Sequence, residues 1–134
     1  MTYALDTNII SYMLKDDDAV YERYYDTLAH GNLCVVPLMV YYEIRRGLMA
    51  FGSYGKLSSF EDLCAELGID DLTVADMNAA ADIYADRKRL GRLPGDTDIL
   101  IAAQAISHGY VLVTNNVRHF EGIAGLQFVN WMEN

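Results

Sequence analysis

Apolar and polar residues follow two different patterns along this chain. Short runs that are apolar at nearly every position, such as residues 33–36 and 111–113, predict strands that are buried on both faces. Longer segments with apolar residues every three or four positions predict helices with one inner face. The predicted strands are residues 3–5, 33–36, 69–74 (weak), 111–113 and 126–129, and the predicted helices are 9–14, 20–28, 38–49, 57–67, 77–90, 99–106 and a short one near 118–120.

Strands and helices alternate in this order, which predicts an α/β fold around a mainly parallel sheet. Right-handed crossovers between parallel strands distribute the helices over both faces of the sheet. We therefore expect a three-layer α/β/α sandwich. The chain has no repeat, linker or low-complexity tract, and its 134 residues suit one hydrophobic core, so residues 1–134 are predicted to form a single domain.

Charge and cysteine content narrow the range of functions. The formal net charge is −9, which argues against binding of nucleic acid through a broad basic surface. A polyanionic substrate would have to meet a local basic patch or a metal ion, and a positively charged protein partner is also compatible with this charge. Cys34 and Cys64 lie in apolar surroundings and are predicted to be buried, reduced thiols, with a disulfide between them as the less favoured alternative.

The chain carries no recognisable signal for export or for a membrane. Residues 1–14 lack a basic start followed by an apolar stretch, and the apolar runs elsewhere are too short to span a bilayer. We therefore expect a cytoplasmic protein without a membrane partner.

Acidic residues follow the predicted strands at one edge of the sheet. Asp6 comes directly after the first strand, and Glu43 lies about two turns into the helix that follows the second strand. Asp96 and Asp98 stand at the start of the buried helix 99–106. Because ligands of such sheets bind at the carboxyl ends of the strands, we expect these acids to meet there.

Each acid also has a simpler interpretation when it is considered alone. Asp6 and Asp96 could cap helices, and Asp98 could complement a helix dipole. Glu43 is more informative, since it borders an apolar helical stripe where a carboxylate needs a partner or a metal. The coincidence of all four favours a functional site over four independent caps.

Clustered carboxylates repel one another, and a divalent cation relieves this repulsion. Ligand sets made only of oxygen favour Mg²⁺ or Mn²⁺ over zinc. Such an ion activates water and stabilises charge on a phosphate. Five arginines could bind phosphate beside it, or could simply solvate helix ends, and the sequence leaves this choice open. They are Arg45, Arg46, Arg87, Arg92 and Arg118.

Four motifs occur in a fixed order along almost the whole chain. They are Leu5–Asn8, Tyr42–Gly47, Gly95–Ala103 and Leu112–Asn116, followed by Phe120–Glu121 and Trp131. The ordered set resembles PIN-domain ribonucleases, specifically the VapC-type toxins of bacterial toxin–antitoxin pairs. The resemblance implies a small α/β/α fold with a parallel sheet and an endonuclease that cleaves RNA with Mg²⁺ or Mn²⁺.

Transferred to this sequence, the resemblance makes Asp6, Glu43 and Asp98 the catalytic acids, with Asp6 and Asp98 as metal ligands. It also implies an antitoxin that blocks the site, a toxin homodimer and a structured RNA substrate such as tRNA. A fourth acidic position in many relatives falls on Asn116, which carries no charge and leaves the number of metal ions open. The supporting polar residues are Asn8, Asp96, Thr114 and Asn116.

Two other functions are compatible with the same residues. A phosphatase or DNA nuclease could use the same metal chemistry, and a catalytically inactive PIN-like domain could act only as a binding module. The presence of Asp6, Glu43 and Asp98 together argues against an inactive copy. A dinucleotide-binding protein is disfavoured, since no glycine-rich loop follows the first strand.

Overall fold

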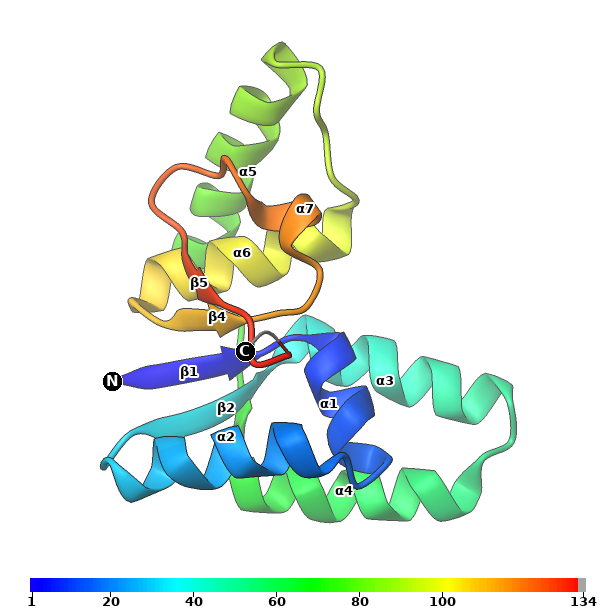
Figure 1. Cartoon of the computed structure of the whole chain (residues 1–134). Helices are drawn as coiled ribbons and strands as arrows, with labels where there is room; N and C mark the ends of the chain where they lie inside the picture. Colours follow the sequence, from blue (N-terminus) through cyan, green and yellow to red (C-terminus); the bar gives the residue numbers. More distant parts are fainter. Residues whose placement is uncertain (133–134) are drawn as a thin grey trace.

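Five parallel strands form the centre of the computed structural model, which describes residues 1–132 (Figure 1). The order across the sheet is β3-β2-β1-β4-β5, and each neighbouring pair is parallel. The predicted mainly parallel sheet is therefore confirmed. The strands are β1 (Thr2–Leu5), β2 (Leu33–Pro37), β3 (Ile69–Asp70), β4 (Val111–Val113) and β5 (Gln127–Val129).

Helices cover both faces of this sheet. In Figure 1, α1 to α4 lie on one side of the strands and α5 to α7 lie on the other. This arrangement is the predicted three-layer α/β/α sandwich. The helices are α1 (Thr7–Leu14), α2 (Asp18–Ala29), α3 (Leu38–Ala50), α4 (Tyr54–Leu67), α5 (Val74–Arg89), α6 (Asp96–His108) and α7 (Val117–Phe120).

The central strand β1 pairs with β2 on one side and with β4 on the other, so Tyr3 lies opposite both Cys34 and Val111. The chain first moves outward from β1 through β2 to β3, and then returns to place β4 beside β1. The direction of winding therefore reverses between β1 and β4. In open parallel sheets the crevice at such a reversal is where ligands bind.

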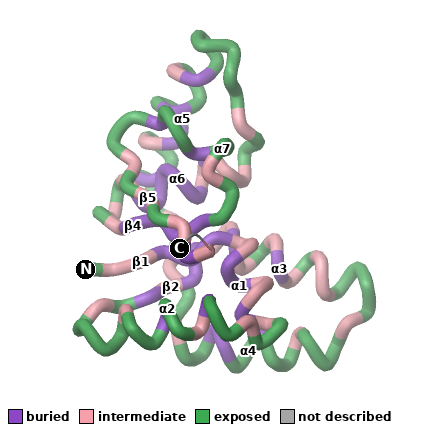
Figure 2. Tube along the Cα trace, in the orientation of Figure 1, coloured by how far each residue is buried: buried purple, intermediate pink, exposed green. Residues whose placement is uncertain are grey.

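The core lies where α6 and α1 pack on the sheet, and Figure 2 shows buried positions concentrated along these elements. Helix α6 buries Ile99 and residues 101–105, as its nearly continuous apolar sequence predicts. Cys34 and Cys64 are both buried and free, which confirms the prediction of reduced thiols.

The predicted strand over residues 69–74 is wrong beyond Asp70. Thr73 instead caps α5: its hydroxyl accepts a hydrogen bond from the backbone N–H of Asp76 at 3.2 Å, and the Asp76 carboxylate accepts one from the Thr73 N–H at 2.8 Å. This reciprocal capping box starts the helix at Val74, three residues before the predicted start.

No helix within residues 1–132 is both long enough and apolar enough to cross a membrane. The single domain over residues 1–134 stays a prediction, and its last two residues, 133 and 134, lie outside the described part of the chain.

Candidate active site

Asp6 lies at the carboxyl end of the central strand, where β1 turns into α1. Its backbone is extended, and its Oδ1 accepts a hydrogen bond from the N–H of Thr7 at 2.8 Å, so it caps α1. The backbone N–H of Asp6 donates to the Val113 carbonyl at 2.9 Å and extends the pairing of β1 with β4. The residue is 3% exposed. Capping alone does not explain such deep burial of a carboxylate, because most caps lie at the surface.

Two polar residues hold the other oxygen of Asp6. The hydroxyl of Thr114, which follows β4 and is fully buried, donates to Oδ2 at 2.7 Å. Nδ2 of Asn8 donates to the same oxygen at 3.2 Å. The Asn8 Oδ1 accepts from the Asn115 N–H at 2.9 Å, so Asn8 links α1 to the loop after β4. Asp6 is therefore fixed in one orientation from both sides of the β1–β4 junction.

Glu43 approaches the same junction from α3. Its Oε1 accepts a 2.7 Å hydrogen bond from the hydroxyl of Thr7, the residue directly after Asp6. The Glu43 side chain is 23% exposed and lies 3.9 Å from Nη2 of Arg46, one helical turn away. Glu43 thus points toward the end of β1 and not into open solvent.

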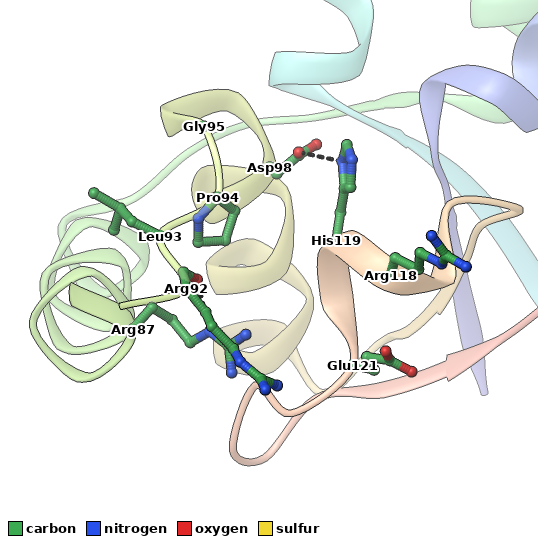
Figure 3. Close-up of a pocket in the computed structure, with 9 residues that line it drawn as sticks. All are labelled: Arg87, Arg92, Leu93, Pro94, Gly95, Asp98, Arg118, His119 and Glu121. Carbon is green, nitrogen blue, oxygen red and sulfur yellow. Dashed lines mark hydrogen bonds and ion pairs between the residues drawn. The ribbon is translucent and has the colours of Figure 1, made fainter. Parts of the chain in front are cut away.

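Asp98 reaches the site from the first turn of α6, where its side chain is 22% exposed. Nδ1 of His119 on α7 lies 2.8 Å from Oδ2 of Asp98 (Figure 3). Because a carboxylate only accepts, the His119 Nδ1–H is the donor in this bond. Nδ2 of Asn116, the N-cap residue before α7, lies 3.0 Å from the same Nδ1. Asp98 is therefore held by α7, while Asp6 is held by Thr114.

The charge of Asp6 is disfavoured in this setting. Burial raises the pKa of the Asp6 carboxyl above its ordinary value of 3.8. Hydrogen bonds from Thr114 and Thr7 lower this pKa in part. The negative charges of Asp98 and Glu43 raise it further, so both of the other predicted acids act on Asp6 across the junction.

This donor set fits a small divalent cation. Within residues 1–132, no three Asp, Glu, His or Cys side chains are grouped closely enough to enclose a metal ion by themselves. Mg²⁺, however, usually binds through one or two carboxylates and keeps several waters. Asp6 supplies carboxylate oxygens from the end of β1, and Asp98 supplies them from the first turn of α6. A cation between them would offset the mutual repulsion that raises the pKa of Asp6.

Other predicted site residues lie elsewhere. Asp96 is exposed and lines a separate hollow between α5 and α6, together with Tyr84, so it is not brought to the carboxylates. Arg45 pairs with Glu61 at 3.1 Å and faces α4. Arg87, Arg92 and Arg118 do lie near the acids, because they line one pocket with Asp98 and His119.

A family model described as the PIN domain matches residues 3–126 of this chain. The chain belongs to the PIN-domain family. Ribonuclease VapC2 of Haemophilus influenzae is 32% identical to it over 135 residues, which cover 98% of this chain and 99% of that protein. The tRNA(fMet)-specific endonuclease VapC of Shigella flexneri is 30% identical over 132 residues, with 98% of each chain covered.

A solved structure agrees with these relatives. The crystal structure of VapBC2 from Rickettsia felis, bound to a DNA fragment from their promoter, matches with a TM-score of 0.90 at 28% identity. The match covers 98% of this chain and 99% of that chain. This PIN domain therefore belongs to the VapC group, as the ordered motifs implied.

Sequence reasoning missed two residues of the PIN-domain site. Thr7 lies within the motif Leu5–Asn8 but was given no role of its own, and His119 was not among the candidate site residues. The spacing of Asn116 and His119, three residues apart on one short helix, does place both on one face. Asp98, the partner of His119, is 21 positions away from it, however, so no local pattern points to this pair.

Proposed function

We propose that this PIN domain is a metal-dependent endoribonuclease and the toxin of a VapC-type toxin–antitoxin pair. One observation carries the proposal: the buried Asp6 is coupled electrostatically to Glu43 and Asp98 at the reversal of the sheet. Relatives that match nearly end to end are named ribonucleases. An inactive binding module would have no need to keep a buried carboxylate next to two other acids that repel it, which costs stability.

We assign a role to each of these residues from its position in the site. Asp6 and Asp98 would hold Mg²⁺ or Mn²⁺, which lowers the pKa of a bound water and stabilises negative charge on the phosphate. Glu43 has one oxygen fixed by Thr7, and we assign it the task of orienting the attacking water and accepting its proton. Asn8 and Thr114 keep Asp6 in place, and His119 does the same for Asp98.

The similarity to VapC proteins also supports a proposal about binding partners and substrate. We propose a cognate antitoxin, a homodimer of the toxin and a cytoplasmic location, with tRNA as the substrate class in view of the relative named tRNA(fMet)-specific endonuclease. The net charge of −9 suits an antitoxin with a basic segment. Light scattering of the isolated chain at micromolar concentration tests the dimer, and a single-chain mass would contradict it.

The decisive experiment is sequencing of RNA 5′ ends after brief expression of the chain in bacteria. We expect new ends at one or a few positions of a structured RNA, reproduced by purified protein with Mg²⁺ or Mn²⁺ and abolished by EDTA. Single-stranded DNA and a small phosphate ester should not be cleaved at comparable rates. Cleavage of the ester or of DNA alone would favour the phosphatase or DNA nuclease alternative, and no cleavage of any substrate would favour the binding module.

A further inference from the structure

A pocket of about 400 Å³ opens directly beside Asp98, and arginines line it (Figure 3). In Figure 3 Asp98 and His119 point toward one another on one side, and Arg87 and Arg92 extend together on another. Arg118 also contributes to the lining, although its side chain extends away from the other two. This local basic lining contrasts with the net charge of −9 of the whole chain.

Arg87 is the unusual member of this pocket because it is only 6% exposed. Within residues 1–132, its side chain makes one hydrogen bond, from Nε to the carbonyl of Arg92 at 3.2 Å. Arg87 and Arg92 form no ion pair with any carboxylate within residues 1–132. A buried guanidinium without an anion is costly, so the protein has a strong electrostatic reason to bind one here.

The backbone around Arg87 is shaped to accommodate its guanidinium. Gly122 has a φ of +83°, and a Cβ added there would lie 2.9 Å from Nη1 of Arg87. A glycine at this position therefore allows both the left-handed turn and the close approach of the charged group. The guanidinium occupies a fitted position beneath the pocket and is not a mobile surface side chain.

The start of α6 adds a second positive influence. Pro94 and Gly95 line the same pocket, and Gly95 is the N-cap of this 13-residue helix without any side-chain hydrogen bond. The N–H groups of the first turn and the positive end of the helix dipole favour an anion at this position, and the carboxylates of Asp96 and Asp98 in the same turn offset part of this effect.

We propose that Arg87 and Arg92 form a phosphate-binding subsite for the RNA phosphate that neighbours the one being cleaved. Asp98 marks the side of the pocket where cleavage takes place, and the two arginines extend on a different side from Asp98, with Glu121 also in the lining. A bidentate guanidinium suits a phosphate dianion or a phosphodiester. The identity of the polymer rests on the proposed ribonuclease function, whereas binding of a phosphate does not.

Phosphate binding is tested first without RNA or metal. Inorganic phosphate is titrated into the full chain in EDTA, and binding is followed by melting temperature and by the NMR signal of the Arg87 Nε–H. We expect phosphate to shift both in the wild type, and the dissociation constant to rise about tenfold or more in Arg92→Gln and in Arg87→Lys. Arg92 is exposed, so its variant is expected to fold normally.

Two further variants make the test specific. Arg89→Gln removes an exposed arginine of the same helix that pairs with Asp86, so it changes the net charge equally and should bind phosphate like the wild type. Glu121→Gln removes the second carboxylate of the pocket and should tighten binding. The proposal is overturned if the wild type does not bind phosphate, or if Arg89→Gln weakens binding as much as Arg92→Gln does.

Cleavage then tests the position of the subsite. For an RNA oligonucleotide, kcat/KM of Arg92→Gln should fall about tenfold, mainly through KM. The loss should be smaller for a dinucleoside monophosphate, which has no neighbouring phosphate, and an equal loss for both substrates would contradict the assignment. If the chain binds phosphate but cleaves no RNA, the proposed function fails while the anion site stands.

Discussion

Replacement of Asp6 by asparagine tests whether Asp6 acts as a catalytic acid or only as a helix cap. Asparagine caps a helix about as well as aspartate, so a purely structural Asp6 would tolerate the change. A metal ligand would not, because the charge that offsets dehydration of the cation is lost. Metal activation supplies several kcal/mol, so a loss of about 3–4 kcal/mol corresponds to a cleavage rate about 10² to 10³ times lower.

The contacts of Asp6 define the effect on stability. The new carboxamide can still accept from Thr7 and can meet a rotated Thr114 hydroxyl, but its NH₂ group faces the NH₂ group of Asn8. One lost hydrogen bond costs about 1 kcal/mol, which is about 4 °C in melting temperature for a domain of this size. Relief of a buried charge opposes this loss, so without metal the melting temperature should stay within about 4 °C of the wild type.

The assay measures cleavage of total RNA with Mg²⁺ or Mn²⁺ by 5′-end sequencing, together with melting curves in EDTA. Asp17→Asn is the matched control, since Asp17 caps α2 through a hydrogen bond from the Val20 N–H at 3.1 Å and lies outside the site. The control should cleave like the wild type. Wild-type cleavage by Asp6→Asn would refute the metal-site interpretation and leave Asp6 as a cap.

Further outcomes are expected. Thr7→Val removes the hydrogen bond to Glu43 and should slow cleavage about tenfold with little change in urea denaturation. In EDTA the wild type should lose stability relative to Asp6→Asn as the pH rises from 3.8 through the raised pKa of Asp6. The reason is that the folded state binds the proton of the Asp6 carboxyl more tightly than the unfolded state does. A constant difference in stability between the two proteins from pH 3 to pH 7 would contradict this. Burial raises the pKa of the Cys34 thiol to about 12 and that of Cys64 to about 11, so native protein should react slowly with a thiol reagent and expose two thiols on denaturation.

The arrangement of elements could be predicted because the apolar pattern differs so clearly between strands and helices. The run 111–113 is buried at every position, as its apolar sequence predicts for an interior parallel strand. In the run 33–36, Cys34 and Val36 are buried, but Leu33 at the start of the strand is exposed. The ends of elements were less predictable, because they depend on side chains that compete for backbone groups. Thr73 lies in a segment whose composition predicts a strand, yet its capping box with Asp76 begins a helix.

The candidate site was predictable where topology alone brings residues together. Asp6 and Glu43 follow neighbouring parallel strands, and parallel strands end at one edge. Asp96 was included wrongly in this group, although helix geometry argues against it, since residues two apart on a helix do not share a face. With Asp98 turned toward His119, Asp96 must point elsewhere. The partnership between His119 and Asp98 depends on how α7 packs on α6, which no local pattern encodes.

The hydrogen bond from Thr114 to Asp6 joins positions 108 residues apart. During synthesis at about 5 to 20 residues per second, roughly 5 to 20 seconds pass between the addition of these two residues. Throughout this interval β1 has no β4 beside it, and the Asp6 carboxylate lacks its shortest hydrogen bond. The order of the strands thus delays assembly of the site around Asp6 until most of the polypeptide has been made. An incomplete chain therefore lacks a complete active site and cannot harm the cell that makes it.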